Sequence, residues 1–575
     1  MKPKAFLMIA VLLASAGLRS QTNGFLQAYD NMHKSFSKYY PFTQWKAIKW
    51  DDVNSWIRPM IQDAESAGDS AGFYIALKSY YDYTHDGHVG FRHGWQNVLN
   101  EARYRQIGGS YGFAVTQLDD GREVARLVNP GSPAYLAGMR FGATILEVND
   151  KPVGEVLDTL PVLWAEMVPA TLEFKKINQR RFLGRGPVGQ TIKVKFLNRG
   201  SSSEMTATLT AVDDNYLTYD QTSMHPVEPV LGVFSRVLQP SGYGYIKMNY
   251  EAADSVQIRA DYLAFKNALI GFNQQGVKGL VLDFRVNSGG NDGLAAAIAG
   301  LFHPDTVLYE IQTWYNPNSD TIEIMPVYVE HFDPQTLKLV KRLNYPKGYL
   351  YSEPQGFYYN KPMVVMVNPR NISSGEGVPM MLKKLQRAPV VSFYGSNGSF
   401  GMVDWSIYLF TPPDSLHVTF PFGQSVDGNL VVQLDSDSLM SGGVTPTVRV
   451  PLNDTVLDRL YIDSMDVELN YAVKTLNSML GIWDPLAGVP GPVLDQNIPN
   501  PFRGSTLITY RLPSETFAVL DFLDITGRIL QTLVSRQEKA GTYDVFFNGS
   551  SYAPGVYFFR LNAGGSEVTR KCVID

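Results

Sequence analysis

The chain has 575 residues, which is too long for one hydrophobic core and predicts three or four domains. A hydrophobic content of 45% with 18% charged residues is typical of a folded protein, and a net charge of -5 without a basic run argues against nucleic acid as a main partner. The single cysteine, Cys572, excludes an intramolecular disulfide. Its position near the chain end also argues against thiol catalysis.

Residues 1–20 have the pattern of an export signal. Lys2 and Lys4 precede an apolar run over 5–18, and the small residue Ser20 follows it. The run is shorter than the roughly 20 apolar residues that a membrane-spanning helix needs. We therefore predict a cleaved signal peptide, with an uncleaved anchor as the alternative, and we predict no later membrane span.

The composition and periodicity of the sequence then change several times along the chain. Residues 21–105 are aromatic-rich with helical periodicity, and 106–212 hold short β-branched runs broken by turn residues. Apolar strands alternate with helical stretches over 213–483, which predicts an α/β core, although 303–361 shows no clear period. A linker rich in proline and glycine at 484–493 precedes a predicted β-sandwich at 494–575.

Two segments of the predicted α/β core carry residues suited to catalysis. In the first, GLVLDFRVNSGGNDG at 279–293, an apolar strand ends before Gly289 and Gly290, whose N–H groups can approach a ligand closely. In the second, VVMVNPRNISSGEG at 364–377, a strand runs into Ser373 and Ser374 before a predicted helix at 377–385. Taken alone, such a serine is more often a helix N-cap than a nucleophile.

The two segments together resemble the C-terminal-processing, or tail-specific, serine peptidase family with a PDZ domain. The shared features are a D-x-R-x-N-x-G-G turn, a later S-x-x-E turn and a closing G-x-x-P at 443–446. The resemblance implies a multidomain α/β protein with a crotonase-like α/β spiral protease core. It also implies that Ser373 is the nucleophile, with the oxyanion hole formed by N–H groups of Ser374 and of Gly289 or Gly290.

The residues around the serine leave open which base would activate it. Many members of the family use a lysine, but the corresponding position here holds Met402, whose thioether cannot accept a proton at neutral pH. Lys383 and Lys384 lie along the helix after Ser373, and we expect both to face solvent.

A tricorn-type branch of the family instead uses a histidine from the N-terminal region. The DGH segment at 86–88 resembles the one that precedes the PDZ module in that branch, and it makes His88 the candidate base. In that branch a serine precedes the histidine, whereas Gly87 stands here. The supporting acid is left open between Asp86 and Asp427, and a purely structural histidine is the alternative.

Residues 111–153 resemble a PDZ domain in their YGF loop, VNPGSPAYLAG segment and GATILEVND strand. A PDZ groove accepts a peptide as an added strand, and its loop N–H groups bind the terminal carboxylate. The resemblance assigns peptide binding to Tyr111, Gly112 and Phe113. The alternative is a PDZ-shaped spacer with a blocked groove.

The segment 494–575 resembles the C-terminal sorting domain of type IX secretion substrates, through DQNIPNPFRGSTLITYRLP, DITGRIL and YAPGVYFFRL. The resemblance implies export from a Gram-negative bacterium through the periplasm by the type IX secretion machinery. It also implies removal of the domain, with release or attachment at the cell surface. A carbohydrate-binding β-sandwich is the alternative.

The sequence therefore predicts a secreted serine endopeptidase that cleaves protein or peptide substrates recognised through their C-terminal tails. A catalytically inactive peptide-binding relative is the rival, because the lysine is replaced by Met402. A crotonase-like hydratase shares only the core fold and fits poorly with export. We predict no cofactor and no metal, since histidines and acids do not fall into spacings such as H-E-x-x-H.

Overall fold

The structure is a computed structural model that describes residues 24–93, 95–224, 232–249, 254–410, 416–481, 492–497, 499–512, 515–539 and 541–575. The predicted signal peptide at 1–20 and nearly all of the predicted linker at 484–493 lie outside the described residues. The chain divides into two compact units, Met1–Leu476 and Asn477–Asp575. In the described ranges, every helix is too short or too polar to cross a membrane.

The first unit begins with four helices: α2 (Phe25–Tyr39), α3 (Trp50–Ala67), α4 (Ser70–Asp82) and α5 (Gln96–Ile107). Aromatic side chains hold them together, with the ring of Trp50 stacked on that of Tyr80 at a centroid distance of 5.8 Å. Strand β1 (Gly90–His93) follows α4 and pairs antiparallel with β22 (Leu416–Gly423), which in turn pairs with β21 (Met402–Phe410). This pairing joins the residues after His88 to a strand more than 300 residues further along the chain.

The β-rich region is a sheet of order β3 (Phe113–Gln117), β4 (Glu123–Val128), β5 (Thr144–Val148), β8 (Thr191–Leu197) and β9 (Met205–Thr210), with β6 (Lys151–Pro152) paired to β5. Helices α6 (Pro133–Leu136), α7 (Val153–Thr159) and α8 (Leu172–Phe182) accompany the sheet. A smaller sheet joins β10 (Val212–Asp213), β2 (Gly109–Ser110) and β7 (Arg185–Gly186), and α9 (Leu217–Thr222) follows it.

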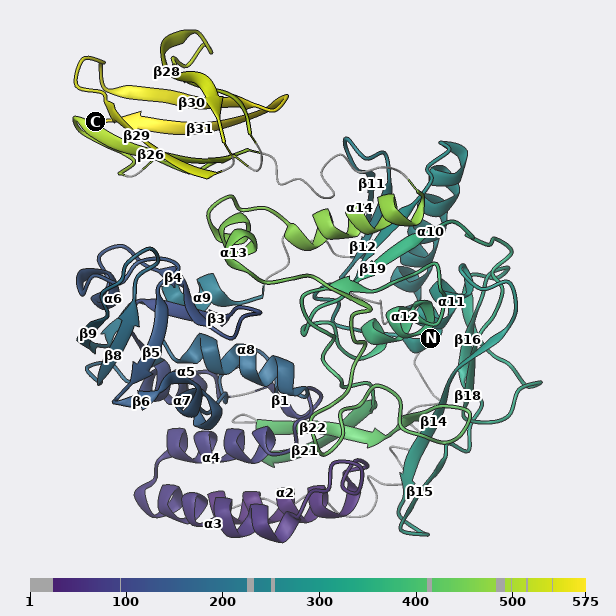
Figure 1. Cartoon of the computed structure of the whole chain (residues 1–575). Coiled ribbons are helices and arrows are strands. Elements are labelled where there is room, and N and C mark those ends of the chain that lie inside the picture. Colours follow the sequence, from purple (N-terminus) through teal and green to yellow (C-terminus); the bar gives the residue numbers. More distant parts are fainter. Residues whose placement is uncertain are drawn as a thin grey trace. The chain divides into compact units, whose positions relative to one another are not determined.

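The α/β core is a sheet of order β11 (Val233–Val237), β12 (Gly244–Met248), β13 (Leu280–Asp283) and β19 (Met363–Met366). The last three strands run parallel, with Asp283 opposite Met366. The helices of this part of the chain are α10 (Ser255–Gln274), drawn in teal in Figure 1, α11 (Asp292–Gly300), α12 (Ser374–Lys383), and α13 (Asp454–Tyr461) and α14 (Val467–Met479), drawn in yellow-green. Helix α12 begins three residues earlier than the predicted 377–385, so Ser373 immediately precedes it.

The segment 303–361, for which the sequence shows no period, consists largely of antiparallel strands. They are β14 (Val307–Asn316), β15 (Thr321–Ile324), β16 (Glu330–Asp333), β17 (Lys338–Lys341) and β18 (Tyr349–Ser352). The middle of β14 is buried on both faces, so its side chains do not alternate between apolar and polar. Strand β14 also pairs with β23 (Ser425–Val426), and the short β20 (Val391–Ser392) pairs parallel with β24 (Val448–Arg449).

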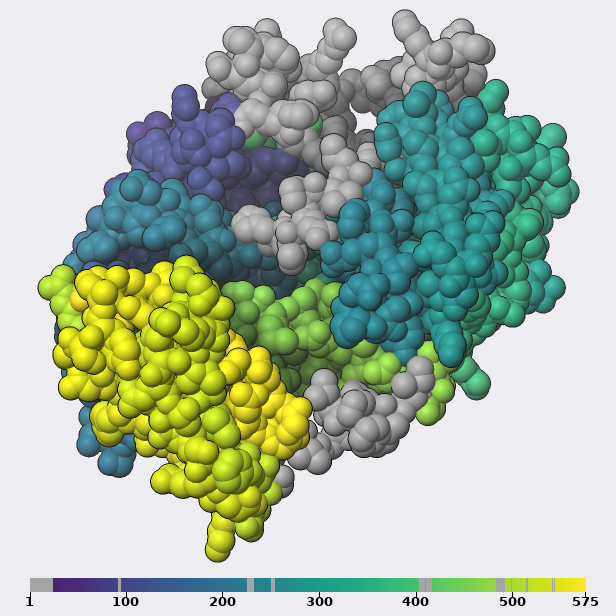
Figure 2. Space-filling model, turned by 90° about the horizontal axis from the view of Figure 1, so that it is seen from above, coloured from purple at the N-terminus to yellow at the C-terminus, as the bar shows by residue number. Residues whose placement is uncertain are grey.

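The second unit has two antiparallel sheets. One has the order β25 (Val493–Leu494), β26 (Ser505–Leu512) and β29 (Gly541–Asn548), and the other has β28 (Ile529–Glu538), β27 (Thr516–Leu523), β30 (Gly555–Ala563) and β31 (Ser566–Ile574). Figure 2 shows this unit in yellow and yellow-green as one continuous body. Buried and less buried residues alternate along β26, as expected of a strand with one face in a core.

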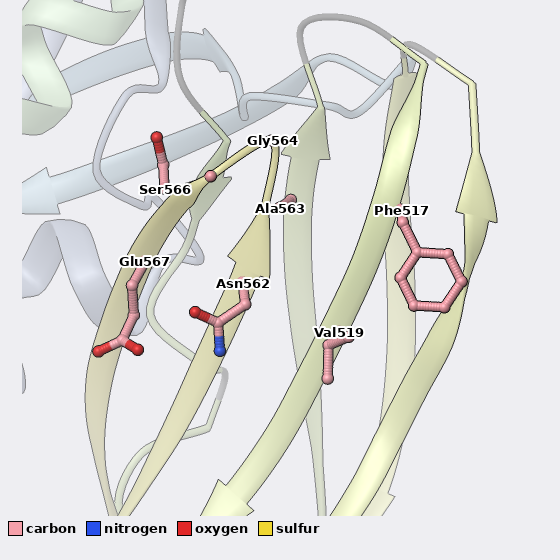
Figure 3. A pocket seen from close by; sticks show the side chains of 8 residues that line it. Phe517, Val519, Asn562, Ala563, Gly564, Ser566 and Glu567 are labelled. Carbon is pink, nitrogen blue, oxygen red and sulfur yellow. The ribbon is translucent and has the colours of Figure 1, made fainter.

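Cys572 is fully buried in the core of the second unit, among side chains that include Leu520, Phe522 and Phe559. Burial raises the pKa of its thiol to about 12, so the thiol stays protonated at neutral pH. A hollow of about 320 Å³ on this unit is lined by residues of β27, β30 and β31, among them Phe517, Asn562 and Glu567 (Figure 3). None of the residues predicted to act in catalysis lines it.

Candidate functional site

The two turns predicted to carry the chemistry lie side by side. Because β13 and β19 are parallel neighbours, the turns that follow them leave the sheet at the same edge. Gly289 has φ +78°, and a Cβ added there would lie 2.5 Å from Cβ of Ser373 and 2.9 Å from the carbonyl oxygen of Ile372. Only glycine fits this position, both for its backbone conformation and for its closeness to the serine.

Ser373 is held in an unusual backbone conformation, with φ 61° and ψ -144°. Such a conformation costs an L-residue on the order of 1–3 kcal/mol and persists only where the surroundings enforce it. The N–H of Ser373 donates to the carbonyl oxygen of Ser399 at 2.9 Å, and the N–H of Glu376 donates to that of Ser373 at 2.8 Å. Within the described part of the chain, the Ser373 hydroxyl does not cap α12, which separates it from an ordinary N-cap serine.

The neighbouring Ser374 hydroxyl is already engaged. It donates to Oδ1 of Asp292 at 2.5 Å and lies 3.2 Å from the carbonyl oxygen of Gly290. Burial raises the pKa of Asp292 to about 6, while the bond from Ser374 opposes that rise. Ser374 therefore fastens the glycine turn to α12, and Ser373 is the better placed of the two serines to react.

The two glycines of the turn differ as candidate oxyanion donors. The N–H of Gly289 donates to Oδ1 of Asn287 at 2.8 Å, so this N–H is occupied within the turn. Asn287 is buried, and its side-chain amide also donates to the carbonyl oxygen of Met248 at 3.0 Å. Gly290 and the first residue of α12, Ser374, are thus better candidates than Gly289 for oxyanion donors.

The charged residues at the start of the glycine turn have a structural role. Arg285 donates to Asp283, Asp466 and Glu468 at 2.7–3.0 Å, and it is mostly buried. Since removing one partner of a buried ion pair strands the other charge, this cluster secures the end of β13.

The segment carrying His88 packs directly on the serine turn. A Cβ added at Gly87 would lie 2.6 Å from Cδ1 of Ile372 and 2.7 Å from Oδ1 of Asn397. The N–H of Gly87 donates to Oγ of Ser399 at 2.9 Å. A side chain at position 87 would have to displace the ends of the Ile372 and Asn397 side chains, so glycine packs most closely where the tricorn-type pattern has serine.

His88 is 8% exposed, and its Nδ1 lies 3.8 Å from Oδ1 of Asp86. Asp86 is fully buried and also accepts the N–H of His88 at 2.9 Å and the hydroxyl of Tyr40 at 2.6 Å. Asp427 instead accepts the N–H groups of Asn429 and Val431 in a turn. Of the two acids left open by the sequence, Asp86 is the one in contact with His88.

One buried acid near this site was missed by sequence reasoning. Asp435 is 2% exposed, and its Oδ1 accepts the N–H of Phe400 at 3.0 Å, while among the described residues its Oδ2 has no hydrogen-bond partner. Burial, then the charge of Asp86, raises the pKa of Asp435 well above its usual value, against the charge of Lys46. Asp435 lies in an irregular loop with no motif around it, so the sequence offered no signal.

Glu376, the acid of the S-x-x-E turn, has a structural role. It is fully buried and accepts the hydroxyl of Ser396 at 2.5 Å and the N–H groups of Gly398 and Ser399 at 2.9 and 3.0 Å. Burial raises its pKa to about 8, and these hydrogen bonds oppose the rise. Glu376 therefore ties the 396–399 loop, and with it the carbonyl that holds Ser373, to α12.

The lysines considered as alternative bases point elsewhere. Lys383 is partly exposed and its Nζ donates to Oγ1 of Thr445 at 2.6 Å, while Lys384 is exposed. Met402 is buried at the start of β21.

The YGF loop of the β-rich region uses its donors internally. The N–H of Tyr111 donates to the carbonyl oxygen of Gly184 at 2.9 Å, and that of Gly112 donates to Oγ of Ser110 at 3.0 Å. Residues Phe113 to Thr116 of β3 are buried. A peptide carboxylate bound here would have to replace at least one of these bonds.

Within the described ranges, no group of three or more histidine, cysteine or acidic side chains is arranged to hold a metal ion.

Two segments of the chain match the models of known protein families. Residues 242–449 match the model of peptidase family S41, a stretch that contains the glycine turn, Ser373 and Glu376 but not His88. Residues 498–575 match the model of the secretion system C-terminal sorting domain. Residues 242–449 therefore form a peptidase S41 domain, and residues 498–575 a type IX sorting domain. Together these matches identify a secreted protease.

Solved structures support the fold. A crystal structure of mature CPAF aligns with a TM-score of 0.51 at 15% identity, over 79% of this chain and 98% of that chain. Mature CPAF complexed with lactacystin aligns with a TM-score of 0.50 at 14% identity, over 80% and 98% of the two chains. At such identities the likeness concerns the fold alone. No curated protein matches the chain.

Replacing Glu376 by Gln tests its structural place. An amide cannot accept from both the Gly398 and Ser399 N–H groups, so we expect a loss of about 1–3 kcal/mol in the free energy of unfolding. Because the folded-state pKa of Glu376 is raised to about 8, its ionisation costs the wild type stability as pH rises from about 5 to 8. The deficit of the variant, measured by urea denaturation, should therefore shrink over that range. A deficit that is constant or grows with pH would contradict this assignment, and Glu155→Gln, at an exposed position, is the control.

Proposed function

We propose that the chain is a serine endopeptidase in which Ser373 is the nucleophile and His88 the general base. The observation that carries this proposal is the packing of the DGH turn on the strained serine turn, through Gly87, Ile372 and Ser399. A serine becomes a useful nucleophile only with a base beside it, and a histidine titrates in the right range.

In the proposed reaction, Oγ of Ser373 attacks the carbonyl carbon of the scissile peptide bond while His88 takes the hydroxyl proton. The carbonyl oxygen becomes an oxyanion that accepts from N–H groups of Gly290 and Ser374 at the start of α12. His88 then gives its proton to the leaving amine, and a water molecule, activated in the same way, hydrolyses the acyl-enzyme.

Asp86 is the acid we assign to His88. Its charge, 3.8 Å from Nδ1, favours the imidazolium that forms during both transfers. The hydroxyl of Tyr40 and the N–H of His88 hold the carboxylate in place, so it can orient the ring as well.

The rival function is an inactive peptide-binding relative that has lost its base. The replacement of the family lysine by buried Met402 favours it, while the strained Ser373 and the docked DGH turn favour the enzyme. For the β-rich region we retain the prediction that C-terminal tails bind at Tyr111, Gly112 and Phe113. Such binding requires local rearrangement of the YGF loop, so tail preference is the more demanding part of the proposal.

The two serines give a matched test of the nucleophile. We expect Ser373→Ala to lower kcat for a peptide substrate by at least about 10³-fold, because no other hydroxyl replaces the nucleophile. Ser374→Ala should cost about tenfold, since it only loosens the link to Asp292. Ser373→Ala should keep the wild-type thermal midpoint, whereas Ser374→Ala should fold with a lower one, because the buried Asp292 carboxyl loses its hydrogen bond. The reverse order of activity would move the nucleophile to Ser374.

The base is tested by pH dependence. Activity of the wild type should fall as pH drops through the range where histidines take up a proton, about 6 to 7. His88→Ala should be nearly as inactive as Ser373→Ala at neutral pH. Met402→Leu, a change in a buried apolar side chain, should stay within about threefold of the wild type. Wild-type activity in His88→Ala would remove the assignment.

The route of export is tested apart from catalysis. We propose passage through the periplasm and then across the outer membrane, directed by 494–575. Fusing this segment to an inert periplasmic cargo in a host with a type IX system should carry the cargo outside the cell, as measured by fractionation. Cargo that remains in the periplasm would contradict the proposal. The same cargo without the segment is the control.

A further inference from the structure

The turn between α2 and α3 reaches the candidate site, although it lies outside the residues that match the peptidase family. Tyr40 donates its hydroxyl to Oδ2 of Asp86 at 2.6 Å. Trp45 donates its indole N–H to the carbonyl oxygen of Asp435 at 2.9 Å. One short turn therefore contacts both buried acids near His88.

Lys46, in the same turn, joins two segments of the site through its ammonium group. It is 8% exposed, and its Nζ donates to the carbonyl oxygen of His85 and to Oγ of Ser436, each at 2.9 Å. His85 immediately precedes the DGH turn, and Ser436 follows Asp435. A single ammonium group thus joins the segment that carries His88 to the loop that carries Asp435.

The charges around this group explain why a lysine is tolerated inside the protein. Burial lowers the pKa of Lys46, and the nearby charges of Asp86, Asp435 and Asp437 oppose that effect. A buried cation is stable where it meets carboxylates and has its donors satisfied. Without Lys46, Asp86 and Asp435 would lose the buried positive charge next to them.

The charged and titratable groups around the DGH turn and the Lys46 ammonium come from several elements. They are Tyr40 and Lys46 on the α2–α3 turn, His85 and Asp86 at the DGH turn, Lys175 on α8, Glu376 on α12, and Asp435 and Asp437 on the loop after β23. Lys46 is the one that bonds both to the chain just before His88 and to the loop of Asp435.

We propose that Lys46 is a positioning residue of the catalytic centre, which holds the His88 turn in register with the Asp435 loop and supplies the buried positive charge between their acids. This inference rests on the proposed function. It assigns to the N-terminal helical region, beyond His88 itself, a part in assembling the active site.

The test compares three variants of the full chain. Lys46→Met keeps an unbranched side chain but removes the ammonium, and we expect kcat to fall about 100-fold with KM within about threefold. Lys46→Arg keeps the charge and donors and should recover at least about a tenth of wild-type kcat. Lys49→Met, at an exposed lysine three residues away, should match the wild type. The inference is overturned if Lys46→Met keeps wild-type kcat, or if folded Lys46→Arg is as inactive as Lys46→Met.

A second variant keeps the inference testable if Lys46→Met does not fold. Ser436→Ala removes one acceptor of the ammonium and leaves the charge in place. We expect kcat about fivefold to tenfold lower in a variant that still folds, with a lower thermal midpoint because the buried ammonium loses one acceptor. Wild-type kcat in this variant would show that the link to the Asp435 loop is not used.

A readout without catalysis separates this inference from the proposed function. In a Ser373→Ala background, NMR follows the titration of the His88 ring, and we expect Lys46→Met to move its midpoint to higher pH, because a nearby cation opposes the imidazolium. If this shift appears in a protein whose wild type cleaves no peptide, the proposed function fails and the placement of Lys46 stands. An unchanged titration would overturn the inference whatever the activity.

Discussion

The parallel pairing of β13 with β19 sets the geometry of the candidate site. Asp283 lies opposite Met366, so the chain leaves both strands at the same edge of the sheet. The glycine turn and the serine turn then meet so closely that Gly289 and Ser373 leave no space for a further carbon atom. A shift in the register of this pair would separate Ser373, the proposed nucleophile, from Gly290, a proposed oxyanion donor.

A loop far along the chain connects the rest of the site to that edge. Ser399 accepts the N–H of Ser373 with its carbonyl and the N–H of Gly87 with its hydroxyl. Glu376 holds the same loop from inside α12. Buried hydrogen bonds therefore hold Ser373 and the turn of His88, the proposed nucleophile and base, next to each other. Each bond is sensitive to the loss of either partner, because the remaining group would be left without one in the interior.

The local parts of this site could be predicted from the sequence, and the long-range parts could not. An apolar strand followed by glycines or serines and then a helix is a pattern of adjacent residues, so the surroundings of Gly290 and Ser373 were predictable. The antiparallel strands of 303–361 were not, because β14 is buried on both faces and lacks alternation. Asp435 and Lys46 lie in turns without a motif, and only the folded chain brings them close to His85 and Asp86. The occupied N–H of Gly289 likewise depends on a side chain, Asn287, whose rotamer the sequence does not specify.

The central claim is that the fold activates Ser373 as a nucleophile. The most direct measurement is reaction of the full-length protein with a fluorophosphonate probe, followed by mass-spectrometric mapping of the labelled peptide. The account predicts one adduct, on Ser373, formed at neutral pH and lost when the protein is denatured beforehand. An adduct on Ser374, or a folded protein that does not react, would contradict it.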